Sequence, residues 1–530
     1  MRILIHLTKT NWLKKTTGNG SETNLTGTIV EKEDFAKLVN AESEPAEMAE
    51  HIGDFTGFFS VIYQKGTSLF ACVDRIRSHP LYYGTANNTF YISDQANWVR
   101  WQVGDSLMDQ IAKDEFQLTG YVTGQNTLFK NVKQLQAGEL LTLADGKLTT
   151  RRYYVLNHTE PQNHNENELE AQLYQTFKKA IERLIEYANG RQIVVPLSGG
   201  FDSRFVATML KESGYTNILC FTYGVKGNRE AQYSKTVANA LGLRWHYVEY
   251  SNEKWQQAFN TPEAVDYRLF SANLTSLAHT QDWLAVKEMK DKAVIENNAV
   301  FVPGHSGDMT AGSHIPKFVF AEPDKIYAAE DAINHVLQAH YCLAPFKEIK
   351  TQKDVFASLI ANLITSDTTY DAKTLANELE KWNWQERQAK FICNSVRVYE
   401  FFGYDWWLPM WDYPYVNFFE NLPLSFRNHD WYRKKVESLY NKYSRSNKQL
   451  GNASQGSKAK QLAIKVLKKS RVVTRICKKL LKFLPVKKGF VAAEGRYPRK
   501  KYKSLQRLGY KSNGIGAYFL LRLLEEKVEQ

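Results

Sequence analysis

The sequence predicts a mixed α/β and α+β fold in two successive parts. Short β-branched and aromatic runs dominate the first 150 residues, whereas helical and strand patterns alternate from about residue 165. Beyond about residue 250 the sequence is mostly helical in pattern and rich in aromatic residues. A chain of 530 residues is long enough for more than one core. Its 43% hydrophobic and 24% charged residues exclude a mostly disordered, collagenous or coiled-coil protein.

Short strands are the main prediction for the first part. We expect strands over residues 3–7, 58–64, 68–73, 89–93 and 139–144. Residues 144–146, Ala-Asp-Gly, predict the turn of a hairpin at the end of this part. A polar stretch over residues 157–168 follows, and it predicts a boundary between a domain 1–158 and a domain 165–530.

Alternating helices and strands are predicted beyond that boundary. Asn165 and Glu168 indicate a helix start, an apolar face follows over 169–185, and Gly190 ends it. We expect strands over residues 192–197, 217–223 and 245–249, with helices over 204–213 and 229–241 between them. Strands joined by helices in this order predict a parallel sheet with right-handed crossovers.

Cysteine usage and the N-terminal residues favour a cytoplasmic protein. The five cysteines are odd in number and never form a CxxC pair, so they predict no disulfide framework, zinc site or redox motif. The N-terminal residues lack the apolar core and cleavage site of a signal peptide. No apolar run reaches the roughly 18 residues that a membrane-spanning helix needs.

Positive charge is concentrated in one segment. Residues 458–503 contain 17 Lys or Arg and one acid, a net charge of +16 in a chain of +13, so the other residues carry −3. The stretch 458–484 has an apolar face at helical spacing. Three interpretations stay open: contact with an anionic membrane surface, nucleic-acid binding, or a solvated helix packed on its domain. We expect nucleic acid to be the weaker partner.

The most informative segment covers residues 194–204, VVPLSGGFDSR, between a predicted strand and a predicted helix. Gly199 and Gly200 let the backbone turn sharply beside a ligand, and a helix N-terminus suits phosphate. Ser198 and Ser203 can donate to phosphate oxygens, whereas Asp202 suits a Mg²⁺ ion that bridges to them. The spacing excludes a Walker A loop and a GxGxxG dinucleotide loop. For the Ser-Gly-Gly triplet alone, an ordinary tight turn is the alternative.

This loop resembles the pyrophosphatase (PP) loop of the adenine-nucleotide alpha-hydrolase class, which cleaves ATP to AMP and pyrophosphate. Three further segments resemble the asparagine synthetase family: residues 53–59, 71–84 (ACVDRIRSHPLYYG) and 127–138. The resemblance implies an Ntn-type αββα glutaminase-like domain followed by a PP-loop synthetase domain. Residues 302–309, 405–412 and 487–490 are similar to later family motifs.

The resemblance also assigns site residues. It implies that ATP and Mg²⁺ are the cofactors, with Asp202 and Asp308 as metal ligands and Lys487 holding pyrophosphate. It places ATP on the loop Ser198, Gly199, Gly200, Phe201 and Ser203, and its adenine and ribose on the backbone of Leu197, Tyr223 and Gly304.

Departures from the family pattern narrow the expected chemistry. Met1 and Arg2 stand where family glutaminases have an N-terminal cysteine, so we expect no glutamine hydrolysis. Ammonia, another amine or a separate glutaminase would supply nitrogen.

His305 stands where the family has its catalytic Glu. A near-neutral pKa would let His305 deprotonate an amine, and the open alternative is that it is a loop residue without a role. Asp405 and Trp407 replace a family Glu and Arg near the substrate, which argues against aspartate.

We therefore expect an ATP-dependent, AMP-forming carbon–nitrogen ligase that turns a small-molecule carboxylate into an amide. Similar proteins without the cysteine accompany surface-polysaccharide genes, which favours a uronic acid, as a free or lipid-linked sugar. Asparagine synthesis, a tRNA-modifying PP-loop enzyme and a nucleotide-binding pseudoenzyme remain alternatives. A homodimer is compatible with the resemblance.

Overall fold

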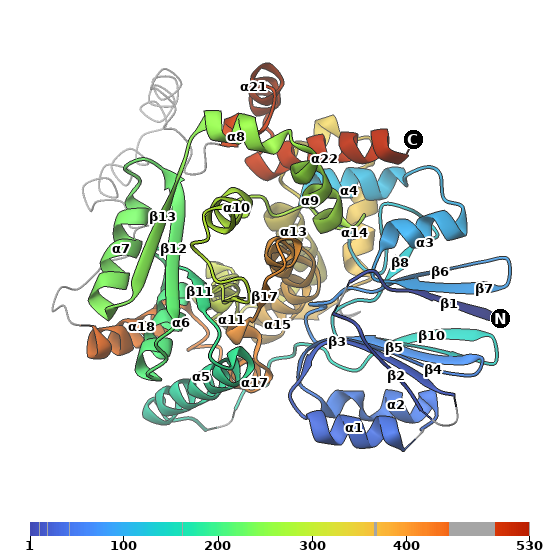
Figure 1. The fold of residues 1–530 in the computed structure, drawn as a ribbon, viewed down its shortest axis with the longest axis horizontal. Helices are drawn as coiled ribbons and strands as arrows, with labels where there is room; N and C mark the ends of the chain where they lie inside the picture. Colours follow the sequence, from blue (N-terminus) through green and yellow to red (C-terminus); the bar gives the residue numbers. More distant parts are fainter. Residues whose placement is uncertain are drawn as a thin grey trace.

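A sandwich of two mostly antiparallel sheets and a separate parallel sheet form the two ends of the molecule, with helices between them (Figure 1). The computed structural model describes residues 1–9, 11–17, 20–41, 43–161, 163–364, 368–444 and 493–528. The predicted amphipathic helix at 458–484, the basic residues up to 492 and Lys487 lie wholly outside these residues. No described helix is long and apolar enough to cross a bilayer.

The sandwich has the αββα order that the family resemblance implies. One sheet has the strand order β10-β9-β5-β4-β3-β2 and the other β1-β7-β6-β8. The strands are β1 (Arg2–His6), β2 (Leu13–Thr16), β3 (Glu22–Ile29), β4 (Gly57–Lys65), β5 (Ser68–Val73), β6 (Tyr82–Ala86), β7 (Thr89–Ser93), β8 (Lys133–Gln134), β9 (Glu139–Ala144) and β10 (Lys147–Arg152). The outer helices are α1 (Lys32–Asn40) and α2 (Pro45–His51) on the first sheet, and α3 (Ala96–Val103) and α4 (Gln110–Thr119) on the second (Figure 1).

Both faces of the six-stranded sheet are buried, which explains why its central strands are apolar at nearly every position. Ile62 of β4 points between the sheets, whereas its neighbours Val61 and Tyr63 pack with α1 and α2. Side chains alternate between faces along a strand, so two covered faces require two apolar sets. The predicted hairpin turn is confirmed: β9 pairs antiparallel with β10 around Asp145 and Gly146, both with positive φ.

The second part is built on a five-stranded parallel sheet with the order β13-β12-β11-β14-β17. Its strands are β11 (Ile193–Pro196), β12 (Ile218–Val225), β13 (Arg244–Tyr250), β14 (Val300–Phe301) and β17 (Asp405–Trp406). The chain adds β12 and β13 on one side of β11 and then returns to place β14 on the other side. The strand order therefore reverses between β11 and β14, and ligands of such sheets bind outside the carboxyl ends of the strands at this reversal.

Helices of this part agree with the predicted pattern, with one shifted start. They include α5 (Glu166–Ala188), α6 (Phe201–Glu212), α7 (Arg229–Leu241), α8 (Asn252–Phe259), α9 (Pro262–Ala272), α10 (Trp283–Asp291) and α11 (Gly307–Thr310). The side chain of Asn165 caps α5, and α7 has the predicted bounds. α6 begins at Phe201, three residues before the predicted start, because Gly200 is its N-cap. Asp202 and Ser203 therefore lie in its first turn.

The remaining described chain is largely helical. It comprises α12 (Lys317–Ala321), α13 (Ala329–His340), α14 (Lys353–Ala361), α15 (Ala372–Trp382), the π-helix η3 (Asn383–Ile392), η4 (Cys393–Val396), α16 (Arg397–Phe401), α17 (Tyr413–Glu420), α18 (His429–Tyr443), α21 (Arg499–Leu508), α22 (Ser512–Val528) and the short strands β15 (Tyr327–Ala328) and β16 (Thr369–Tyr370). η3 also binds the sandwich: the Trp384 indole donates to the carbonyl of Arg75 at 2.8 Å. The helical region therefore fixes the sandwich against the parallel sheet.

Candidate active site

The candidate site lies at the reversal of strand order, where the loop after β11 meets the loop after β14. A Cβ added to Gly304 would come within 2.5 Å of the Ser203 backbone nitrogen. A Cβ on Gly307 would come within 2.8 Å of the Asp202 carboxylate. Only glycine permits so close an approach. The two loops, about a hundred residues apart in sequence, thus form one surface.

Hydrogen bonds to its own hydroxyl groups fix the conformation of the predicted phosphate loop. The Ser203 hydroxyl accepts a hydrogen bond from the Ser198 backbone N–H at 3.1 Å, and the two hydroxyl oxygens are also 3.1 Å apart. The Ser198 hydroxyl accepts from the Gly200 N–H at 3.1 Å. Leu197 continues the sheet by donating to the carbonyl of Phe221 at 2.8 Å. The loop therefore places hydroxyl groups and the start of α6 where phosphate oxygens can bind.

Two charged residues beside the loop were not predicted as site residues. The carboxylate of Glu230, in the first turn of α7, accepts from the Gly199 N–H at 2.9 Å. It thus occupies a donor that a phosphate could use. Arg204 is fully buried, donates to the Gly199 carbonyl at 3.3 Å, and lies over the rings of Phe201 and Tyr440. The sequence contained Arg204 within the quoted motif, but no pattern indicated Glu230.

The carboxylates of Asp202 and Asp308 are brought together as the resemblance implies. Burial, and then the negative charge of Asp308, raise the pKa of Asp202 to about 8, whereas the nearby hydroxyl of Tyr432 lowers it. One oxygen of Asp202 is buried without a hydrogen-bond partner among the described residues. The Asp308 side chain is 47% exposed. A buried, unpartnered oxygen beside a second carboxylate fits a hard cation such as Mg²⁺, which keeps several ligands from phosphate and water.

No group of three or more His, Cys, Asp or Glu within the described ranges could hold a metal by itself. Asp202 and Asp308 could therefore supply only part of a Mg²⁺ coordination shell. Phosphate oxygens of a nucleotide would have to complete it, as is usual for Mg²⁺ in phosphate-handling enzymes.

His305 is fixed by Ser395, and its protonation differs from the sequence expectation. The Ser395 hydroxyl donates to the Ile392 carbonyl at 2.6 Å, so its oxygen accepts from Nδ1–H of His305 at 2.9 Å. This leaves Nε2 as the unprotonated ring nitrogen. Burial, and then the proximity of His279, lower the pKa of His305 to about 4. The expected near-neutral pKa is therefore wrong, because partial desolvation of the ring by the surrounding protein disfavours its charged form.

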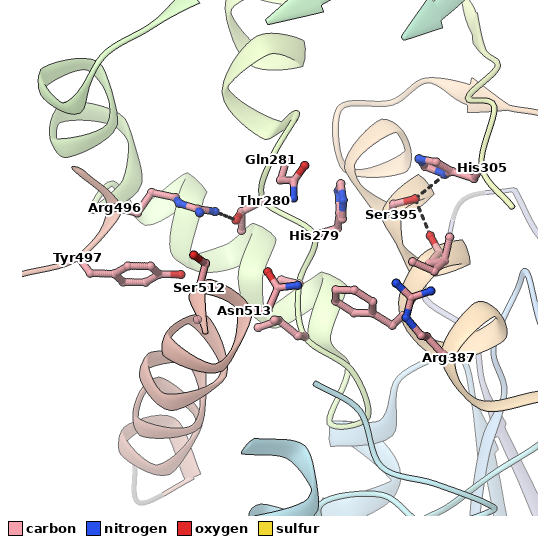
Figure 2. A pocket seen from close by; sticks show the side chains of 15 residues that line it. His279, Thr280, Gln281, His305, Arg387, Ser395, Arg496, Tyr497, Ser512 and Asn513 are labelled. Atoms are coloured by element: carbon pink, nitrogen blue, oxygen red, sulfur yellow. Dashed lines mark hydrogen bonds between the residues drawn. The ribbon is translucent and has the colours of Figure 1, made fainter. Parts of the chain in front are cut away.

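A cavity of about 250 Å³ opens beside His305 (Figure 2). It lies between the 277–281 segment, η3 and the start of α22. The Gln281 carbonyl accepts from the hydroxyl of Tyr250, at the carboxyl end of β13, at 2.7 Å. The cavity therefore adjoins the carboxyl edge of the sheet. Its polar lining comprises His279, Thr280, Gln281, His305, Arg387, Ser395, Arg496, Ser512 and Asn513.

The other predicted nucleotide contacts lie along the same edge. Tyr223 is near the carboxyl end of β12 and stacks on Tyr250 with ring centroids 5.0 Å apart. Gly304 lies three residues after the end of β14. Phe201 is buried and begins α6. The structure thus gathers every described member of the predicted set at one edge, and Lys487 lies outside the described residues.

The aromatic stretch near residues 404–415 lies mostly in the core. Trp406, Trp407 and Trp411 are 6%, 3% and 6% exposed, and Trp407 packs edge-on against Phe58 of the sandwich. A cavity of about 340 Å³ beside residues 403–407 faces the sandwich rather than the phosphate loop. These rings therefore act mainly in packing. The carboxylate of Asp405 pairs with Arg191.

Sequence reasoning missed several residues that complete the site: His279, Arg387, Ser395, Arg496 and Glu230. Ser395 was hidden because its role depends on a contact with a residue 90 positions away. Arg387 lies on a π-helix whose side-chain directions the usual helical period does not predict.

Comparison with known proteins agrees with this architecture. The model of the glutamine amidotransferase domain matches residues 40–154, within the sandwich. The model of asparagine synthase matches residues 172–437, from α5 to α18 and including both loops of the site. These two matches define the class of protein: an amidotransferase-type sandwich joined to an asparagine-synthase-type sheet. The chain belongs to the asparagine synthase family.

Individual relatives are distant. A probable asparagine synthetase [glutamine-hydrolyzing] of Acanthamoeba polyphaga mimivirus is 27% identical over 173 residues, 32% of this chain and 29% of that protein. A tRNA-specific 2-thiouridylase MnmA of Mesomycoplasma hyopneumoniae (strain 7448) is 24% identical over 222 residues, 38% of this chain and 54% of that protein. The chain thus spans about half or less of the curated relatives' lengths.

Solved structures resemble this chain only weakly, with low sequence identity and low TM-scores. An NH3-dependent NAD synthetase from Campylobacter jejuni is 14% identical, with a TM-score of 0.19, over 28% of this chain and 61% of that one. A glutamine phosphoribosylpyrophosphate amidotransferase from B. subtilis is 9% identical, with a TM-score of 0.18, over 55% of this chain and 63% of that one. Likenesses of this size carry no argument about function.

Proposed function

We propose that the protein is an ATP-dependent ligase that adenylates a substrate carboxylate and converts the acyl-adenylate into an amide. The observation that carries this proposal is the meeting of Asp202 and Asp308 at the phosphate loop, beside a polar cavity. A nucleotide site and an acceptor cavity that share one edge allow an acid and the α-phosphorus of ATP to approach each other.

The first step would use the phosphate loop. A carboxylate oxygen of the substrate attacks the α-phosphorus of ATP, and the bond to the leaving pyrophosphate breaks. The hydroxyl groups of Ser198 and Ser203 and the start of α6 bind phosphate oxygens. Mg²⁺, when held by Asp202 and Asp308, would neutralise negative charge on the phosphates. Lys487 would add a positive charge, as the family resemblance implies.

The second step would use His305. An amine or ammonia attacks the acyl carbon, and AMP leaves. The attacking nitrogen becomes positively charged and acidic as the new bond forms. Nε2 of His305 carries no proton, because Nδ1–H is committed to Ser395, so it can accept this proton. A pKa of about 4 keeps the ring unprotonated at neutral pH but also makes it a weak base, so the transfer relies on the acidity of the positively charged attacking nitrogen.

We propose that the nitrogen comes from ammonia or an amine rather than from glutamine hydrolysed by the sandwich. The sandwich cysteine, Cys72, is fully buried in β5, and burial raises the pKa of its thiol. A buried protonated thiol is a poor nucleophile. A separate glutaminase that delivers ammonia is compatible with this arrangement.

The substrate acid would be a small molecule, with uronic acids and their nucleotide- or lipid-linked forms as the first candidates. The cavity beside His305 offers hydroxyl, amide and guanidinium donors that suit a polar, oxygen-rich molecule. Aspartate remains the alternative acid of the family.

A tRNA substrate is the second candidate function. One observation favours it: three of the curated relatives are named tRNA-specific 2-thiouridylases. Against it, the asparagine synthase match covers residues 172–437, and an amidotransferase domain precedes it at residues 40–154. RNA-stimulated turnover of ATP would favour this second function.

The test measures exchange of radioactive pyrophosphate into ATP, and AMP release with ammonium, against aspartate, uronic acids and nucleotide-linked uronates. We expect exchange that requires a carboxylate and disappears in Asp202→Asn. The same variant should unfold at a higher temperature, because it removes a buried carboxylate beside Asp308. Exchange that persists in Asp202→Asn, or turnover with RNA only, would contradict the proposal.

A further inference from the structure

Arg387 is the charged group of the cavity that no other described residue neutralises. Its side chain extends from η3 toward the cavity that His305 also lines (Figure 2). No hydrogen bond or ion pair joins its guanidinium to any residue that the structure describes. Guanidinium groups in partly enclosed sites normally bind carboxylates or phosphates through paired N–H donors. Within the described ranges, the guanidinium donors of Arg387 therefore have no acceptor.

The second arginine of the cavity is already engaged. The guanidinium of Arg496 donates to the hydroxyl of Thr280 and lies over the rings of Trp255 and Tyr497. No acidic side chain is among the described residues that line the cavity. The described lining therefore holds two arginines and no carboxylate, and the nearby carboxylate of Asp282 lies behind the lining, 3.2 Å from Nδ1 of His279.

The other side of Arg387 has the same character. It borders a smaller cavity of about 170 Å³, lined also by His314, His335, His340 and Asn383. No carboxylate is among these described lining residues either. The guanidinium thus lies between two spaces that both offer hydrogen-bond donors, and an anion could reach it from either.

The chemistry of adenylation indicates which anionic group of a substrate would bind to Arg387. The reacting carboxylate loses its negative charge when it becomes an acyl-adenylate. An arginine bound to that same carboxylate would make its oxygen a weaker nucleophile. The ion pair would also be lost once the carboxylate is adenylated. A second anionic group that stays charged throughout the reaction can remain bound to the arginine. The reacting carboxylate is then free beside the phosphate loop.

We propose that Arg387 binds a second anionic group of the acyl substrate, so that this substrate is an acid with at least two negative charges. The second group is a phosphate or another carboxylate. This inference rests on the proposed function and names the substrate class of the same site. Arg387 is then the residue that distinguishes such acids from singly charged ones.

The test compares acids that differ only in the second charge. D-glucuronate 1-phosphate is paired with D-glucuronate, and aspartate with β-alanine, in the pyrophosphate exchange assay. We expect exchange with the doubly charged member of at least one pair. Arg387→Gln should raise the KM for that acid about 10- to 100-fold, the usual loss for a charged hydrogen-bonding partner, and leave the KM for ATP unchanged. Arg387→Lys should recover part of this loss.

Arg244→Gln is the matched control, since Arg244 begins β13 at the opposite edge of the sheet. Equal use of both members of each pair by the unaltered protein, or an Arg387→Gln effect on the KM for ATP instead of the acid, would overturn the inference. Absence of exchange with every acid would contradict the proposed function. Calorimetric binding of D-glucuronate 1-phosphate then decides for Arg387 alone: binding lost in Arg387→Gln supports the anchor, and unchanged or absent binding refutes it.

Discussion

The ammonium group of Lys390 lies 2.6 Å from the carboxylate of Glu386, and neither side chain is exposed. The Glu386 carboxylate also accepts from the Gly124 N–H, and Lys390 donates to the carbonyls of Val122 and Gly124. Both charges on η3 are thus satisfied by a loop of the sandwich. This buried pair joins the two parts of the molecule next to the cavity that Arg387 lines.

Lys390→Met should destabilise the protein by about 3–5 kcal/mol, because it leaves the Glu386 carboxylate buried without its counter-charge. Thermal unfolding followed by circular dichroism measures this as a lower Tm. The double variant Glu386→Gln/Lys390→Met should recover part of the loss. Lys37→Met is the control: its pair with Asp34 is exposed and worth at most about 1 kcal/mol. A Lys390→Met protein as stable as this control would show that the pair does not hold the two parts together.

Gly307→Ala should impair catalysis more than stability. The new methyl group would meet the Asp202 carboxylate at 2.8 Å and displace it. A shift of about 1 Å at a reacting site lowers rates by roughly 100-fold. Pyrophosphate exchange with ATP measures the loss. Gly53→Ala is the control, since nothing lies within 4 Å of its added Cβ. Unchanged exchange in Gly307→Ala would mean that Asp202 has no role in the reaction.

Glu230→Gln should strengthen ATP binding. The amide oxygen can still accept from the Gly199 N–H, while the negative charge near the phosphates disappears. We expect the KM for ATP to fall about 2- to 5-fold, the effect of one charge through a water-like medium at a few ångströms. Steady-state kinetics at low salt measure it, with the exposed Glu186→Gln as control. A higher KM would indicate that Glu230 supports the loop or a cation instead.

The stability of the protein should fall as the pH drops from about 6.5 to 4, partly because of His305. Its folded pKa of about 4 lies below the ordinary value of 6.5, so the unfolded chain takes up a proton first. The contribution of neutral His305 is full above pH 6.5 and declines by up to about 3 kcal/mol on the way to pH 4. His305→Gln should reduce the difference in Tm between pH 7 and pH 5. An unchanged difference, equal to that of the exposed His51→Gln, would contradict a lowered pKa of His305.

Much of the fold could be predicted because its signals are local. Asn228 and Gly242 bound α7 at the predicted residues, since a side-chain cap and a left-handed glycine act within one turn. The family resemblance, carried by short motifs, implied the sandwich. The start of α6 could not be placed so well, because Gly200 caps it without a side-chain hydrogen bond.

The sequence by itself determined the glycine-rich turn over residues 198–203 between a strand and a helix, the order of helices and strands, and the presence of His305 where the family motif has a Glu. These depend on residue type and short spacing. Only the tertiary structure decided that Ser395 fixes the tautomer of His305, that desolvation lowers its pKa to about 4, and that Arg387 lines the cavity without a partner among the described residues. Such properties depend on which distant segments pack around a group, because burial and neighbouring charges set its protonation and its pairing.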